Sequence, residues 1–154
     1  MPIRDIPISR NDLCLPPDAC LKDALDLMLA RQMDHVAICR ADGRFVGLLS
    51  TNAIIDALVP ASARMVGGLS DLSFTGDALR LLTAHLHDLG GLPVSRFADQ
   101  EVRTMHEGAP ILEAAKLLSE IGTPLPVVSD DGRFLGALTL RDLLGHIVAN
   151  GRSA

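Results

Sequence analysis

Apolar side chains recur at helical spacing in two separate parts of the chain. The first stripe consists of Leu21, Ala24, Leu25, Met28 and Leu29. The second has similar spacing and consists of Ile111, Ala114, Ala115, Leu118 and Ile121. This spacing is typical of a helix that buries one face. We therefore expect two amphipathic helices, the first with Asp18 as its N-cap and the second with Pro110 in its first turn.

Each stripe is followed by the same short block. Residues 42–47 read DGRFVG and residues 131–136 read DGRFLG, so five of six positions match. Short apolar runs flank both blocks, at 36–39 and 48–50 in the first copy and at 125–128 and 137–139 in the second. An Asp-Gly pair between two apolar runs predicts a hairpin, because glycine accepts the positive φ of a tight turn. We expect positive φ at Gly43 and Gly132.

The two copies also share their ends. Short extended segments open them at 13–15 and 102–105, and short helices close them at about 52–58 and 140–149. Pro60 is expected to stop the first closing helix, and Gly151 to follow the second. The chain is thus predicted to be α/β (α+β), with two βαββα repeats. Because one such repeat buries little surface, we expect the two to pack together with approximate two-fold symmetry.

The predicted domain organisation places the first repeat at 1–60 (core 13–59) and the second at 99–154 (core 102–148). Residues 61–98 form a linker that carries one extra helix at about 75–89. Leucines at positions 79, 82, 86 and 89 give this helix its apolar stripe, and the pair Gly90-Gly91 ends it.

Composition and charge exclude several functions. The net charge of −5 and the pI of about 5.4 argue against nucleic-acid binding, which needs a basic face. The uncharged apolar runs are far shorter than the roughly 20 residues of a membrane span, and the N-terminus lacks the apolar region of a signal peptide. We therefore predict a cytoplasmic protein. Three cysteines without a CxxC pair suggest neither a disulfide framework nor a thiolate metal site.

The chain also lacks recognisable catalytic motifs. It has no GxSxG, no Cys/His signature and no glycine-rich phosphate loop, so we predict no enzyme activity. His85, His87 and His106 invite a metal-binding interpretation. Helix positions two apart point to different sides, however, so we predict no metal site.

Residues 125–142 read LPVVSDDGRFLGALTLRD. This segment resembles the CBS domain family, whose pattern joins a strand–hairpin–strand unit to a terminal T-x-x-D at the start of the last helix. The first copy departs from that pattern, with Ala37 in place of proline and Ala53 in place of the final aspartate. The resemblance covers both copies and implies a stand-alone tandem CBS pair, or Bateman module, with a regulatory role.

The resemblance implies an adenosyl ligand (AMP, ADP, ATP or S-adenosylmethionine) in a cleft between the repeats. Asp142 would accept both ribose hydroxyls, since a carboxylate has several acceptor positions. Thr139 and the helix N-terminus would face a phosphate, with Arg141 beside it. The base side would consist of Cys14, Ala19, Asp34, His35, Val36 and Ala137.

The second cleft would be degraded. It would use Ser50 and position 53, where alanine removes the ribose carboxylate. Its base side would consist of Thr104, Ala109, Thr123 and Pro124. We expect this cleft to be weak, empty or used otherwise.

Simpler interpretations remain for each residue. Asp142 is also suited to complement the helix dipole, Arg141 to pair at the surface and Cys14 to serve as a small buried residue, while His35 needs no task. At the level of function, the alternatives are a non-binding dimerisation or adaptor protein and a small hydrolase that lacks a visible base or metal. We also predict a homodimer, because Leu/Ala-rich helix surface exceeds what one chain buries, and a regulated partner protein of unknown identity.

Overall fold

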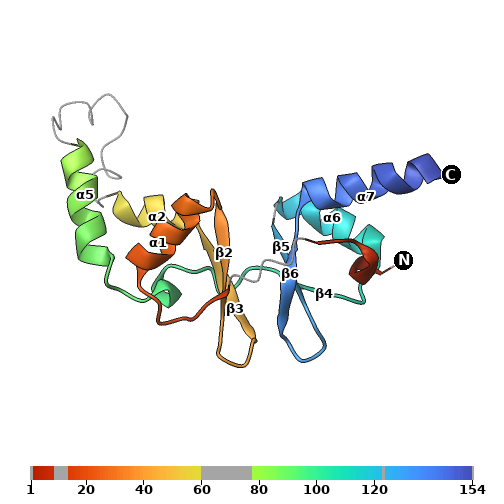
Figure 1. Ribbon diagram of the computed structural model, residues 1–154, viewed down its shortest axis with the longest axis horizontal. Helices are drawn as coiled ribbons and strands as arrows, with labels where there is room; N and C mark the ends of the chain where they lie inside the picture. Colours follow the sequence, from red (N-terminus) through yellow and green to blue (C-terminus); the bar gives the residue numbers. More distant parts are fainter. Residues whose placement is uncertain (1, 9–13, 60–77, 123, 154) are drawn as a thin grey trace. The chain divides into compact units, whose positions relative to one another are not determined.

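A computed structural model describes residues 2–8, 14–59, 78–122 and 124–153 of the 154-residue chain (Figure 1). The first repeat contains β1 (Cys14–Leu15), α1 (Leu21–Ala30), β2 (His35–Cys39), β3 (Phe45–Ser50) and α2 (Thr51–Leu58). Its strands form a sheet in the order β1-β2-β3, and α1 and α2 lie on one side of that sheet. The predicted strand, helix, hairpin, helix order is therefore confirmed for this repeat.

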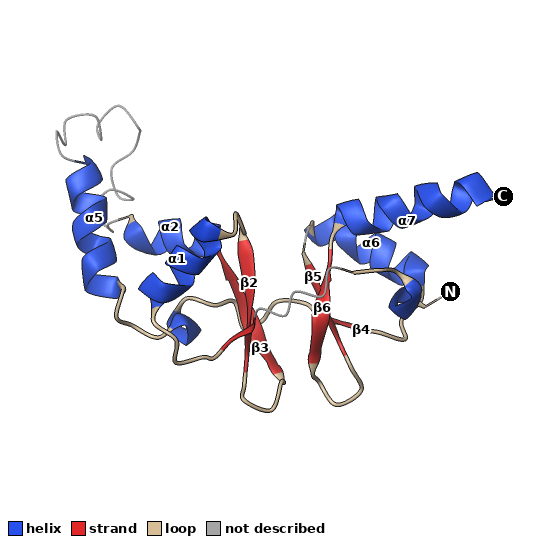
Figure 2. Cartoon of the chain, viewed as in Figure 1, coloured by secondary structure: helices blue, strands red, loops and turns tan. Residues whose placement is uncertain are grey.

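The second repeat has the same order of elements (Figure 2). It contains β4 (Met105–His106), α6 (Ile111–Ile121), β5 (Leu125–Val128), β6 (Phe134–Leu138) and α7 (Leu140–Ser153). β4 runs parallel to β5, and β5 pairs antiparallel with β6. The α+β class with two three-stranded sheets is confirmed. The two-fold packing of the repeats stays a prediction.

Three short elements lie outside the βαββα pattern. They are η1 (Ile3–Asp5), α5 (Ala78–Leu89) and η2 (Val94–Arg96). α5 is the extra helix expected between the repeats, and it contacts α1 and α2. Its expected start near Thr75 falls outside the described residues, as does the expected helix stop at Pro60. The two 3₁₀ turns were not predicted.

Three expected helix ends differ from the structure. Pro110 is the N-cap of α6 and not part of its first turn. The N-cap of α1 is Cys20 instead of Asp18, and its side chain makes no capping bond. The first N–H groups of α1 donate instead to the carbonyls of Leu92 (2.9 Å) and Gly90 (3.0 Å), which replaces a side-chain cap. At the other end of the chain, α7 continues through Gly151 to Ser153. A glycine near a helix end costs about 1 kcal/mol, which does not force termination.

Each 3₁₀ turn packs on the repeat other than the one that follows it directly in sequence. η1 packs on the second repeat, and η2 packs on the first. The Ile3 N–H donates to the Ala109 carbonyl at the start of α6 (2.9 Å), and the Val94 N–H donates to the Ala19 carbonyl at the start of α1 (2.8 Å). Ile3 is 2% exposed and Val94 is fully buried. Each repeat is therefore completed by a segment from elsewhere in the chain.

The chain accordingly divides into two compact units that do not follow the repeats. The first comprises residues 1–14, 39–46 and 101–154, and the second comprises 15–38 and 47–100. The core of the first unit joins η1 to the second repeat and consists of Ile3, Ile6, Met105, Ala114, Leu117, Leu118, Leu125, Val127, Leu138 and Leu143. These units combine parts of both repeats, so the repeat boundaries expected at residues 60 and 99 stay predictions.

Within the first unit, the two hairpin turns pair with each other. The Phe45 N–H donates to the Gly132 carbonyl and the Phe134 N–H donates to the Gly43 carbonyl, both at 3.0 Å. The rings of Phe45 and Phe134 stack, with centroids 5.6 Å apart. Both glycines have the expected positive φ, at 89° and 83°. Their role is therefore structural, since a side chain at such φ values is strained.

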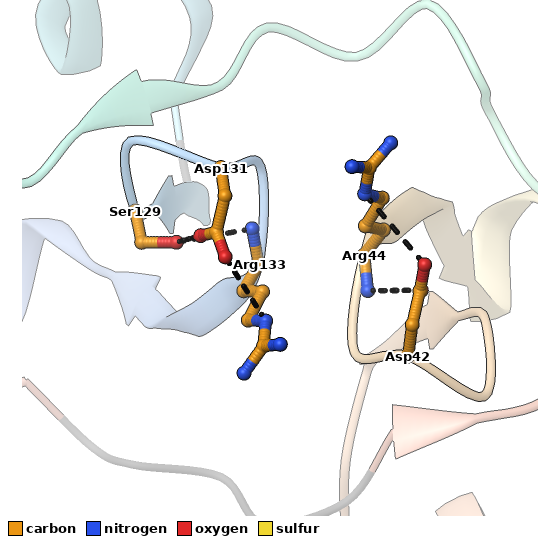
Figure 3. Close-up of polar contacts among 5 residues, drawn as sticks. All are labelled: Asp42, Arg44, Ser129, Asp131 and Arg133. Carbon is orange, nitrogen blue, oxygen red and sulfur yellow. Dashed lines mark hydrogen bonds and ion pairs between the residues drawn. The ribbon is translucent and has the colours of Figure 1, made fainter.

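In each of these turns an aspartate carboxylate accepts a hydrogen bond and forms an ion pair with a nearby arginine (Figure 3). Asp42 accepts a hydrogen bond from the Arg44 N–H at 3.1 Å, and its carboxylate lies 3.6 Å from the Arg44 guanidinium. Asp131 accepts from the Ser129 hydroxyl and pairs with the Arg133 guanidinium at 3.1 Å. The hydrogen bond from Ser129, aided by Arg133, lowers the pKa of Asp131. Because these side chains are exposed, the pairs hold turn geometry more than they add stability.

Gly47 in β3 packs against the backbone of Asp99 and Gln100. The Leu48 N–H donates to the Asp99 carbonyl at 3.0 Å and the Asp99 N–H donates to the Leu48 carbonyl at 2.9 Å. A Cβ atom built on Gly47 would lie 2.7 Å from the Asp99 carbonyl oxygen. In the first copy, the second glycine of the repeated block is therefore required by a backbone contact and not by a turn.

We predict that Gly47→Ala lowers the free energy of unfolding by about 1–3 kcal/mol, because the Asp99 backbone must move and its paired bonds weaken. Urea denaturation followed by circular dichroism measures the change. Gly145→Ala in α7 is the matched control, since nothing lies within 4 Å of its added Cβ. The control should gain up to about 1 kcal/mol from helix propensity. Unchanged stability of Gly47→Ala would contradict the close contact.

Candidate ligand site

Thr139 and Asp142 form a reciprocal cap where β6 enters α7. The Asp142 N–H donates to the Thr139 hydroxyl oxygen at 3.1 Å, and the Thr139 N–H donates to Oδ2 of Asp142 at 3.2 Å. Both residues are half-buried. The simpler interpretation of Asp142, as an acid that serves the helix N-terminus, is thus correct as far as it goes.

The cap leaves acceptor capacity on Asp142. A carboxylate has about four lone-pair positions, and the bond from Thr139 uses one of them. The remaining positions suit a donor pair such as two vicinal hydroxyls. Arg141 is exposed beside it, and Ala137 lies half-buried two residues before Thr139. Together with the N-terminus of α7, this junction offers an acceptor for hydroxyls, a cation and helix N–H groups.

The corresponding junction of the first repeat has only half of this cap. The Ala53 N–H donates to the Ser50 hydroxyl oxygen at 3.0 Å, which is the counterpart of the bond between Asp142 and Thr139. The reverse bond is missing, because position 53 has no side-chain acceptor. The helix starts normally at this junction, but the carboxylate that could bind hydroxyls is absent.

The base-side residues of the first cleft differ in what they offer. Ala19 is half-buried, with its N–H on the Pro16 carbonyl (3.1 Å) and its carbonyl on the Val94 N–H. Asp34 is exposed, and its backbone carbonyl accepts a hydrogen bond from the Thr51 N–H at 2.9 Å. This carbonyl oxygen keeps one lone pair for a further donor. Val36 is 1% exposed, so its side chain belongs to the core and only its backbone could serve a ligand.

His35 is half-buried at the start of β2. Burial lowers the pKa of its imidazole, and the charge of Asp34 offsets part of that effect. The neutral form is therefore favoured, which suits a hydrogen-bonding contact more than a charge contact.

Cys14 is exposed, which corrects the interpretation of it as a small buried residue. Its sulfur lies 2.9 Å from the sulfur of the buried Cys39 on the neighbouring strand. Sequence reasoning missed this contact because the two cysteines are 25 residues apart and form no recognised motif. The available signal was that both sit on strands expected to share a sheet.

The second cleft is only partly described. Thr104 is exposed and Ala109 is half-buried, with its carbonyl accepting from the Ile3 N–H. Pro124 is half-buried, whereas Thr123 lies outside the described residues.

The predicted site residues fall in both compact units. Cys14, Ala137, Thr139, Arg141 and Asp142 belong to the first unit, whereas Ala19, Asp34, His35 and Val36 belong to the second. The structure brings Thr139 and Asp142 together directly. The cleft that would join the two groups stays a prediction.

Two of the three histidines considered for a metal have other contacts. His85 Nδ1 lies 3.0 Å from the Leu58 carbonyl oxygen, and His106 pairs with Asp130. Within the described ranges, no three His, Cys, Asp or Glu side chains come together as metal ligands. In the same ranges, no helix has the length and apolar character needed to cross a membrane.

Comparison with known families gives a match over both repeats. The model described as "CBS domain" matches residues 3–60 and 94–149, together well over half of the chain. The two matches begin at Ile3 and Val94, the buried first residues of η1 and η2. The A-adding tRNA nucleotidyltransferase of Aquifex aeolicus (strain VF5) is 23% identical over 142 residues, which are 92% of this chain and 14% of that protein. The chain therefore spans only a small part of that relative.

Solved structures agree on the fold. CBSX2 from Arabidopsis thaliana, a CBS-pair protein, has a TM-score of 0.76 at 20% identity, covering 99% of this chain and 98% of that chain. A structure of CBSX2 in complex with AMP has a TM-score of 0.71 at 17% identity, covering 97% and 98%. A CBS domain-containing protein of unknown function from Bacillus anthracis has a TM-score of 0.74 at 15% identity, covering 97% and 94%. At these identities the likeness concerns the fold alone.

The lowered pKa of His35 predicts a pH dependence of stability. Its folded pKa lies below the reference value of 6.5, so the unfolded chain takes up a proton more readily. Stability is therefore full above about pH 6.5 and falls as the pH drops from there towards the folded pKa. In urea denaturation at about pH 8 and about pH 5, His35→Gln should lose less stability than the wild type. Equal losses in both proteins would contradict this assignment.

Proposed function

Because the chain belongs to the CBS domain family and carries that domain twice, we propose that it is a regulatory module that binds an adenosyl ligand. AMP, ADP, ATP and S-adenosylmethionine share the adenosine part that the site would recognise. Ligand binding would change the arrangement of the repeats, and a partner protein would respond to that change. The proposed role is non-catalytic, in keeping with the regulatory character of this family.

The observation that supports this proposal is the carboxylate of Asp142. Its cap to Thr139 fixes the side chain at the start of α7 while leaving acceptor positions for a ribose diol. Thr139, Arg141 and the helix N-terminus would contact a phosphate. The known AMP complex of CBSX2, a protein with the same fold, makes AMP the first ligand to test.

The base side would be assembled from the second unit together with Cys14 and Ala137. The Asp34 carbonyl and the neutral imidazole of His35 would offer hydrogen bonds to the edge of a purine. The second cleft, with Ser50, Thr104, Ala109, Thr123 and Pro124, would lack the ribose carboxylate. One ligand per chain is therefore the proposed stoichiometry.

We also propose that the module works as a homodimer through α7. Apolar side chains on one stripe of this helix are exposed, namely Leu140 (39%), Leu144 (59%), Ile147 (51%) and Val148 (51%). This i, i+4, i+7, i+8 stripe is the pattern of a buried helix face. A second copy of the chain would cover it with the same stripe.

A non-binding dimerisation or adaptor protein is the second candidate. The exposed stripe of α7 and the missing carboxylate at Ala53 favour it. The intact pair of Thr139 and Asp142 opposes it, because an adaptor has no need of a second acceptor oxygen at this junction. Nothing in the described residues favours the hydrolase, whose chemistry would need a base or a metal beside the ligand.

We predict that calorimetry shows one AMP per chain and that Asp142→Asn weakens binding about ten- to hundred-fold. The asparagine oxygen keeps the cap, whereas its amide group cannot accept from ribose, and a charge-assisted bond contributes about 1.5–3 kcal/mol. Asp142→Ala should weaken binding similarly but also remove the cap. Ala53→Asp, the matched change in the first repeat, should keep the first site and can supply the second. Equal affinity of wild type and Asp142→Asn would refute the ribose assignment, and absence of a shift with any adenosyl ligand would favour the adaptor.

Light scattering tests the homodimer. We predict a dimer mass for the wild type and a monomer mass for Leu144→Glu or Ile147→Glu, because a buried charge without a partner is disfavoured in an apolar interface. Ala149→Glu is the control, since Ala149 is exposed on the opposite side of the same helix from this stripe. A concentration-independent monomer mass for the wild type would contradict the proposal, as would loss of the dimer in Ala149→Glu alone.

A further inference from the structure

Two of the three cysteines meet across neighbouring strands. Cys39 donates a hydrogen bond to the Cys14 sulfur at 2.9 Å, and the two strands that carry them are adjacent in the β1-β2-β3 sheet. Both cysteines belong to the same compact unit. The third, Cys20, lies at the start of α1.

The contact has the geometry from which a disulfide can form. Neighbouring strands generally lie about 4.8 Å apart, so residues that face each other across them can fall within the range of about 4.4–6.8 Å that is usual between the Cα atoms of disulfide-bonded residues. The sulfur atoms lie 2.9 Å apart and must approach by just under 1 Å to reach the bond length of about 2.05 Å. Small rotations of the two side chains can supply that movement without breaking the sheet.

The two thiols also differ in a way that assigns them roles. Cys14 is an exposed residue, whereas Cys39 is 4% exposed, so an oxidant from solution has better access to Cys14 than to Cys39. The hydrogen bond to Cys14, together with burial, raises the pKa of Cys39. Cys39 therefore keeps its proton, and the sulfur of the exposed Cys14 accepts the hydrogen bond. In such an arrangement Cys14 is suited to react first and Cys39 to resolve the product as a disulfide.

We propose that Cys14 and Cys39 are a peroxide-responsive thiol pair that converts reversibly to an intrachain disulfide. The Cys14 sulfur, as thiolate, attacks a peroxide oxygen. A sulfur–oxygen bond forms, the oxygen–oxygen bond breaks, and hydroxide leaves to become water with the Cys14 proton. This step leaves a sulfenic acid on Cys14.

The Cys39 sulfur then attacks the Cys14 sulfur. The sulfur–sulfur bond forms as the sulfur–oxygen bond breaks, and the departing hydroxide takes the Cys39 proton as water. The two thiols have lost two electrons and two protons, and the peroxide has become two water molecules. A dithiol such as dithiothreitol reverses the change by thiol–disulfide exchange.

The consequence is a covalent tie between β1 and β2 that closes a loop containing α1. Cys14 and Cys39 are also the residues at which the chain passes between the two compact units, at positions 14–15 and 38–39. The tie would restrict the unfolded chain, so the oxidised protein is expected to melt at a higher temperature than the reduced one. This inference does not depend on adenosyl binding.

The test treats reduced full-length protein with hydrogen peroxide and measures intact mass, thiol content and the positions of linked peptides. We expect a mass lower by about 2 Da, one thiol remaining of three, and a single linkage between Cys14 and Cys39. Cys20→Ser is the matched control and should form the same linkage with no thiol left. Three reactive thiols after treatment, or a disulfide that uses Cys20 or joins two chains, would overturn the proposal.

Variants of the pair separate the two steps. Cys39→Ser should stop at a sulfenic acid on Cys14 that dimedone traps, whereas Cys14→Ser should form no disulfide. Because Cys39 is buried and its replacement can impair folding, the wild-type melting temperature before and after oxidation gives a second readout. A rise that dithiothreitol reverses supports the pair. A fall would mean that the bond forms only by distorting the strands, and it would overturn the proposal.

Discussion

The fold depends on an exchange of two short turns. Ile3 and Val94 each donate a backbone hydrogen bond to a residue two positions before a helix, in the repeat other than the one that follows them directly, and both side chains are buried there. Neither repeat is complete as a continuous stretch of chain. The exchange explains why α1 needs no side-chain cap, since the carbonyls of Gly90 and Leu92 arrive with the second turn. It also explains Gly47, because the segment that follows this turn crosses β3 at Asp99.

The hairpin blocks show a second constraint, which acts on the sequence itself. The hexapeptide at 42–47 pairs with its copy at 131–136, through reciprocal backbone bonds and a stacked Phe pair. Because equivalent residues of the two blocks contact each other, the same residue type is suited to both positions. The aspartate fastens the turn, the first glycine takes positive φ and the phenylalanine stacks. The one difference, Val46 against Leu135, falls at a half-buried position of a strand.

Local pattern predicted the elements but not the contacts that complete them. Helical stripes, Asp-Gly turns and apolar runs were enough for the order of helices and strands, because each signal lies within a few residues. The N-cap of α1 was misplaced because its partners are some seventy residues away in sequence. Residues 2–8 carried no periodic signal, although Ile3 and Ile6 belong to the core. The contact between Cys14 and Cys39 was missed for the same reason. At the candidate site, the T-x-x-D spacing placed Thr139 and Asp142 at the same strand-to-helix junction, but the reciprocal bonds between them were not predicted.

The two strand-to-helix junctions show that the start of the helix does not depend on the carboxylate that is proposed to bind the ligand. At Thr139 the cap is reciprocal, and Asp142 has two duties, since it accepts from the backbone and would accept from ribose. At Ser50 the hydroxyl still accepts from the Ala53 N–H, so the half of the cap that starts the helix survives. One capping bond contributes about 1 kcal/mol, a small part of the stability of a domain. An alanine at position 53 is thus nearly neutral for folding, although it lacks the carboxylate that the proposed site assigns to the ribose. Stability therefore does not oppose a chain in which one junction carries the carboxylate and the other does not.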